Sequence, residues 1–132
     1  MDAAIIKYYR NLLKTGFQNA GSLETPSVLL EIIGDGRVCG SAGDYMRIFI
    51  NIVNGRIETI KYLCTCDPPT NVAVEALCNL AKDKTLSDVQ AISDESFFQT
   101  LGTRSEDLGN KARGLLELLN RGLTQYQKPS RG

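Results

Sequence analysis

Cysteine and aspartate are the residue types of this sequence most able to do chemistry together. Cys39 lies in a glycine-rich stretch that ends at Asp44, and Cys64 and Cys66 form a C-x-C pair further along the chain. Thiolates combined with one carboxylate suit iron, an iron–sulfur cluster or zinc. Cys39, Asp44, Cys64 and Cys66 are therefore the candidate metal and cofactor ligands.

The sequence contains no histidine. This absence excludes a Ser-His-Asp triad, a Cys-His dyad and any histidine metal ligand. Chemistry at this site must use Cys, Asp, Glu, Lys, Tyr or backbone groups, which excludes much of the hydrolase repertoire.

Length and charge limit the class of protein. The 132 residues suit one domain, and 15 basic and 15 acidic side chains cancel. A net charge of zero argues against nucleic-acid binding by phosphate neutralisation and gives no support for docking on an anionic membrane. We expect a cytoplasmic protein, because no secretion signal or apolar membrane span is visible. Thiols stay reduced there, and clustered cysteines favour metal binding or redox chemistry over structural disulfides.

Hydrophobic patterns predict the elements that position these residues. Residues 2–14 have helical spacing, within an N-terminal helical arm over 1–16. Three strands follow over 28–34, 44–53 and 56–64, and Asn54-Gly55 is a strong hairpin signal between the last two. The segment 28–64 is therefore predicted to be a three-stranded antiparallel meander.

Helices follow the strands. Pro68 and Pro69 suit the first turn of a helix, and a helical part is expected over 69–126, with a polar tail at 127–132. The last helix, over about 106–126, carries a stripe of Leu108, Ala112, Leu115, Leu116, Leu119 and Leu123. Strands followed by helices predict an α+β fold, a single domain over 1–132 with the helices packed on one face of the sheet.

This arrangement gathers the candidate ligands at one corner. The Asn54-Gly55 turn places residues opposite each other when their numbers sum to about 109, so Asp44 is expected near Thr65. A bulge would shift this register by one residue. The stretch with Cys39 would then hang over Cys64 and Cys66. The positive end of the helix at Pro69 points at the corner, which predicts lowered thiol pKa values.

Simpler interpretations compete with a metal site. One interpretation is that the thiols are incidental, those of Cys39, Cys64 and Cys66. Another is that Asp44 serves only as a turn residue. Cys78 lies mid-helix beside apolar residues and is predicted to be a small core residue. In a further alternative from another functional class, Cys64 and Cys66 form a labile disulfide in a thiol redox protein.

From about Tyr8 to Tyr126 the sequence resembles the scaffold proteins for iron–sulfur cluster assembly, of the IscU type and the N-terminal domain of NifU. The segments that carry the resemblance are GRVCGSAGDYMRIFINIVNGRIETIKYL, CTCDPPTNVAVEAL and KDKTLSDV. Gly43-Asp44 is the best single anchor. The resemblance implies the same α+β fold and a scaffold, not an enzyme, that holds a transient [2Fe-2S] cluster or iron. It also implies a cysteine desulfurase and apo-protein cluster acceptors as partners.

The ligand set departs from this family's pattern. The family has a cysteine directly before Gly-Asp, where this chain has Ala42, and Cys39 lies three residues upstream. The family's third cysteine is expected near residues 109–111, where this chain has none. Two accounts fit. In the first, the ligands are relocated, and the cluster is held by Cys39, Cys64 and Cys66. Asp44 then supplies an oxygen ligand or tunes the lability of the cluster. In the second, a degenerate scaffold binds or regulates partners of the assembly system.

Overall fold

The turn at Asn54-Gly55 organises the sheet. In the computed structural model, which describes residues 3–33 and 44–127, both turn residues have positive φ, 53° and 74°. Such angles match a two-residue hairpin turn. The turn joins β2 (Tyr45–Val53) to β3 (Arg56–Cys64), and β1 (Val28–Ile33) pairs antiparallel with β2 in the order β1-β2-β3. The predicted meander is confirmed.

A register shift lies between Asn51 and Ile52. Near the turn Ile52 pairs with Ile57, but beyond the shift Met46 pairs with Cys64. The numbers of paired residues therefore sum to one more than expected at the far end of the hairpin. The expected sum of about 109 thus holds to within one residue, because Glu58 is an extra, unpaired residue of β3 that displaces the ladder by one position there.

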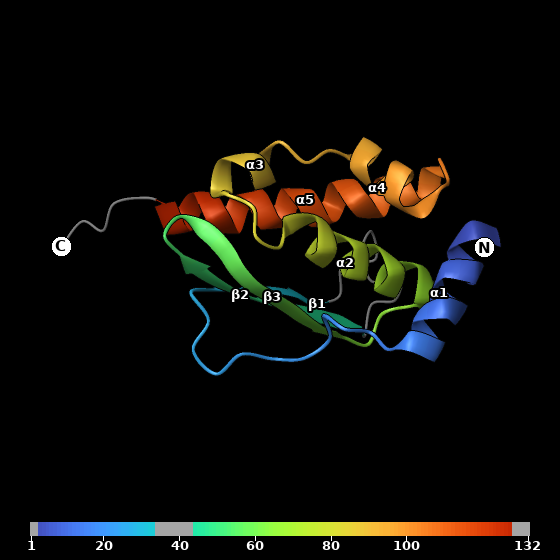
Figure 1. Cartoon of the computed structure of the whole chain (residues 1–132), viewed down its shortest axis with the longest axis horizontal. Helices are drawn as coiled ribbons and strands as arrows, with labels where there is room; N and C mark the ends of the chain where they lie inside the picture. Colours follow the sequence, from blue (N-terminus) through green and yellow to red (C-terminus); the bar gives the residue numbers. More distant parts are fainter. Residues whose placement is uncertain (1–2, 34–43, 128–132) are drawn as a thin grey trace.

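Helices cover one face of the sheet, as predicted (Figure 1). Helix α2 packs against β3 and α5 packs against β1, and the two helices contact each other; α3 and α4 lie further from the sheet, against α5. The bounds are α1 Ala3–Thr15, α2 Pro68–Ala81, α3 Leu86–Gln90, α4 Asp94–Leu101 and α5 Glu106–Gln127. None of these helices is both long and apolar enough to cross a membrane.

The core lies between the sheet and this helical layer. The predicted leucine stripe of α5 is buried throughout, from Leu108 to Leu123. Helix α2 is buried almost all round, because β3, α1, α4 and α5 contact it on different sides. A helix in that position can have no wide polar face, so its sequence shows little amphipathic contrast.

A buried carboxylate fixes the segment between α1 and β1. This segment runs beside the outer edge of β3, where the backbone N–H of Tyr62 donates to the Asn19 carbonyl at 3.0 Å. Glu75 of α2 is 2% exposed. It accepts hydrogen bonds from the Asn19 side-chain amide and, at 3.1 Å, from the Tyr62 hydroxyl. Burial, reinforced by the Glu75 carboxylate, raises the pKa of Tyr62. One carboxylate thereby ties three elements together.

Candidate functional site

The open end of the hairpin forms the corner predicted to hold the site. The backbone N–H of Thr65 donates to the Tyr45 carbonyl at 3.0 Å, which extends the ladder past Cys64. The Thr65 hydroxyl donates to Asp44 Oδ1 at 3.2 Å. Asp44 therefore lies beside Thr65, as the hairpin predicted. The corner is completed by the start of α2, where Asp67 caps the helix and Pro68 and Pro69 occupy its first turn.

Cys64 and Cys66 face the interior side of this corner. Thr65 between them is exposed, Cys64 is half-buried and Cys66 is 7% exposed. Alternate residues of an extended segment share a face, so the C-x-C spacing itself directs both sulfur atoms inward.

Cys64 is a free cysteine held by several polar groups. Its thiol donates to Asn71 Oδ1 of α2, with 3.3 Å between sulfur and oxygen. Burial raises the pKa of this thiol, and the negative charges of Asp44 and Asp67 add to the effect, while a hydrogen bond from the Cys66 backbone N–H opposes it. The expected lowering of the thiol pKa was therefore wrong for Cys64, because burial and two carboxylates raise this pKa by more than the Cys66 N–H lowers it.

A thiol with a raised pKa reacts slowly with alkylating agents at mild pH, because only the thiolate is a nucleophile. We expect Asp44→Asn to speed alkylation of Cys64 by iodoacetamide at pH 8 roughly threefold, since removing a nearby negative charge lowers the pKa and increases the thiolate fraction. Mass spectrometry of the Cys64 peptide gives the rate. Glu31→Gln, in a strand-to-strand ion pair with Arg47, is the control and should leave the rate unchanged. An unchanged rate in Asp44→Asn would remove this carboxylate from the site's electrostatics.

Cys66 differs from Cys64 because it is disulfide-bonded. Its sulfur lies 3.5 Å from the Tyr45 carbonyl oxygen. The expectation that the clustered cysteines are all reduced is wrong for Cys66. Cys64 is free, so the two residues are not joined to each other. This finding argues against the alternative in which Cys64 and Cys66 form a redox-active disulfide.

Two further cysteines complete the set. Cys39 lies outside the described residues. Cys78 is fully buried in α2, and burial raises the pKa of its thiol, which confirms its prediction as a core residue. Within residues 3–33 and 44–127, no three Cys, Asp or Glu side chains converge closely enough to hold a metal ion.

An ion pair at the corner, between a buried lysine and a half-exposed aspartate, was missed in the sequence. Lys111 of α5 is 4% exposed, and its Nζ lies 3.7 Å from Asp67 Oδ1. Asp67 also accepts hydrogen bonds from the backbone N–H of Thr70, at 3.3 Å, and from its hydroxyl. One carboxylate thus caps α2 and holds α5 against it. The only sequence signal was a lysine inside an otherwise apolar helical stripe.

Asp67→Ala should lower the free energy of unfolding by about 2 kcal/mol, because it removes the helix cap and also a half-exposed carboxylate beside the buried Lys111 ammonium. Thr85→Ala is the matched control. Thr85 caps α3 by accepting from the Asp88 N–H at 3.1 Å, and its loss should cost only about 1 kcal/mol. Urea unfolding gives both values. Equal losses in the two variants would show that Lys111 adds nothing to the role of Asp67.

Comparison with known proteins identifies the fold. No protein-family model and no curated protein matches the sequence. Among solved structures, a nitrogen-fixing NifU-like protein (N-terminal) from Brucella abortus aligns over 98% of this chain and 95% of its own, with TM-score 0.64 and 7% identity. A putative iron–sulfur cluster assembly scaffold protein for the SUF system from Fervidobacterium islandicum AW-1 aligns over 96% and 86%, with TM-score 0.54 and 11% identity.

The chain has the NifU/SufU fold. A hypothetical protein of 12% identity also shares it, with TM-score 0.61 over 94% of this chain and 99% of that one. The NifU/SufU fold was the architecture expected from the sequence resemblance, and it places the start of α5 at the cysteine corner. At residues 109–111, where the resembled family would have its third cysteine and this chain has none, the structure has Lys111, buried beside Asp67.

Proposed function

We propose that this protein is a scaffold, not an enzyme, for iron–sulfur cluster assembly, which carries a transient [2Fe-2S] cluster or iron as its cargo. The observation that supports the proposal best is the NifU/SufU fold over nearly the whole chain, combined with two cysteines and an aspartate at one corner of it. Cys39, Cys64, Cys66 and Asp44 are the proposed ligands. Zinc is the competing ion, because the same donors suit it.

The described residues indicate what loading requires. The Cys64 thiol must lose its proton, and the Cys66 N–H that donates to its sulfur then stabilises the thiolate. The Cys66 disulfide must first be reduced by two electrons from an external dithiol, which gives one thiol at each sulfur. We propose a cytoplasmic location, where the glutathione and thioredoxin systems keep such thiols reduced.

The proposed partners follow from the cargo. A cysteine desulfurase would supply sulfur, and apo-proteins that need a cluster would accept it. A second candidate function is that of a protein that keeps the scaffold fold and binds partners of the assembly system without a cluster. It is favoured by Lys111, which stands where the resembled family would have a third thiolate ligand. Iron binding separates the two functions.

The test is an anaerobic titration of the dithiol-reduced protein with ferrous iron, followed by native mass spectrometry. If the protein is a scaffold, the wild-type chain retains stoichiometric iron. The Cys39→Ser variant then retains none, and the Cys78→Ser variant retains as much as the wild type. If the reduced wild-type protein retains no iron, the scaffold proposal is wrong and the partner-binding function takes its place.

A further inference from the structure

Helix α1 presents a basic face that the cysteine corner does not use. Lys7, Arg10 and Lys14 are exposed and recur at the spacing of one helical face, and α1 contains no acidic residue. No ion pair joins them to a carboxylate anywhere in the described part of the chain. Helix α1 therefore carries a local excess of positive charge, although the net charge of the whole chain is zero.

The same face is hollowed. A cavity of about 890 Å³ runs along α1 from Ala3 to Lys14, and Leu101 at the end of α4 closes one side. The half-buried side chains of Ile6 and Tyr8 give it a small apolar part, Leu101 itself is buried, and Lys7, Arg10 and Lys14 supply its charges. Among the residues that the structure describes, all of the lining but Leu101 belongs to α1, so this is an open groove suited to a segment of a macromolecule.

We propose that this groove of α1 binds an acidic amphipathic helix of a partner protein. Its apolar part accepts the apolar face of such a helix, and the three cations face the partner's carboxylates. This surface is independent of the proposed cargo site, and either proposal can fail alone.

Charge and shape favour a protein over other anionic partners. Three cations are fewer than the phosphate contacts on which nucleic-acid binding depends, and the zero net charge of the chain adds no attraction. A membrane-surface helix needs a broad exposed apolar face. The core-facing side of α1, with the buried Ile5, is covered by the protein, and Leu13 is its only highly exposed large apolar side chain.

The test uses fluorescence anisotropy with a labelled peptide that has glutamate along one helical face and leucine along the other. The 132-residue chain should bind this peptide and not its lysine-for-glutamate counterpart. Lys7→Glu/Arg10→Glu should weaken binding roughly tenfold, because each reversal removes an ion pair and adds repulsion. Circular dichroism checks that the variant folds.

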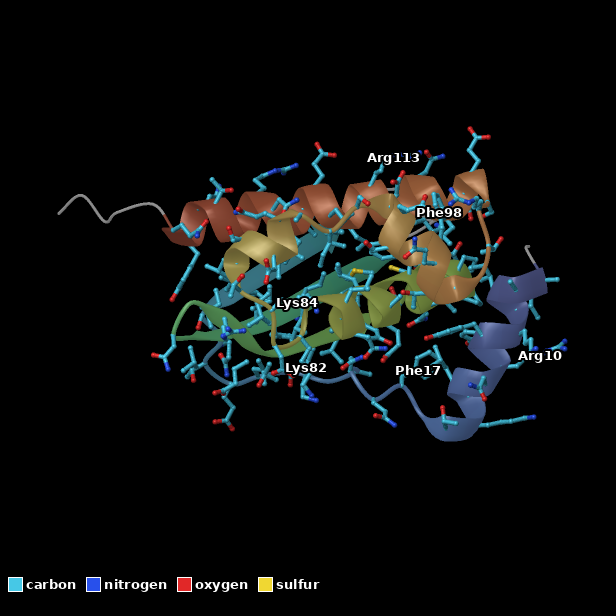
Figure 2. All side chains as sticks on the ribbon, turned by 45° about the horizontal axis from the view of Figure 1, so that its top comes forward. Arg10, Phe17, Lys82, Lys84, Phe98 and Arg113 are labelled. Atoms are coloured by element: carbon cyan, nitrogen blue, oxygen red, sulfur yellow. The ribbon has the colours of Figure 1, made fainter. Side chains whose placement is uncertain are left out.

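Lys82→Glu/Lys84→Glu is the matched control. It changes the net charge equally on the connection between α2 and α3, away from Arg10 in Figure 2. Binding should then be unchanged. An equal loss in the control, or no binding of the acidic peptide by the wild-type protein, would overturn the proposal. Stronger binding to phosphatidylserine vesicles or to oligothymidine than to the peptide would also overturn it and reassign the face to a membrane or a nucleic acid.

Discussion

The Cys64→Ser/Cys66→Ser variant should bind at least about tenfold less iron than the reduced wild-type protein. Mutating a residue that only hydrogen-bonds to a metal ligand already weakens metal binding about tenfold or more, and removing two thiolate ligands should weaken it at least as much. A serine hydroxyl is not ionised at neutral pH, and it is a poorer ligand for iron than a thiolate. The two side chains lie on one face of the chain, so their removal empties one side of the corner. Iron per protein after gel filtration is the measurement.

Cys78→Ser controls for the general loss of a cysteine. Cys78 is fully buried in α2. It should retain iron as the wild type does, although its thermal stability will fall. If the double variant and Cys78→Ser retain equal amounts of iron, the cysteine corner does not hold the cargo.

Glu75→Leu should be among the most destabilising single substitutions in the chain. Leucine fits the size of the buried site, but it accepts no hydrogen bond from the Asn19 amide or the Tyr62 hydroxyl. Buried donors without an acceptor are expensive, and we expect a loss of about 3 kcal/mol in the free energy of unfolding. Urea unfolding at neutral pH, with the midpoint and the slope both fitted, gives this value.

Tyr62→Phe separates one hydrogen bond from the whole cluster. It removes only the hydroxyl donor and leaves Glu75 with the bonds from Asn19, so a loss of about 1 kcal/mol is expected. Should Glu75→Leu prove as mild as Tyr62→Phe, the carboxylate would not be the group that ties the segment beside β3 to α2.

Local sequence signals predicted most of the fold because each has a local physical cause. Asn54-Gly55 predicts its turn from the left-handed angles that these residues tolerate, and the leucine stripe of α5 predicts the face that packs on the core. The shift at Asn51 could not be predicted, because the pairing of a strand depends on its partner. The near-complete burial of α2 also depends on neighbours that are distant in the sequence.

The candidate site was predicted less well than the fold. Register correctly brought Asp44 to Thr65, but the protonation of Cys64 depends on Asp67 and on burial, which appear only in three dimensions. The role of Lys111 was missed because its partner lies on another helix. Cys39 falls outside the described residues, so its place at the corner stays a prediction.

The most direct test of the central claim is cluster assembly followed by transfer. The dithiol-reduced protein is reconstituted anaerobically with iron and sulfide, separated from free ions and mixed with an apo-protein that accepts a [2Fe-2S] cluster. Visible absorption and circular dichroism follow both steps, and bound iron, sulfide and zinc are assayed in the same sample. The account predicts a coloured protein that loses its cluster to the acceptor. A colourless protein, or one that holds only zinc, would contradict it.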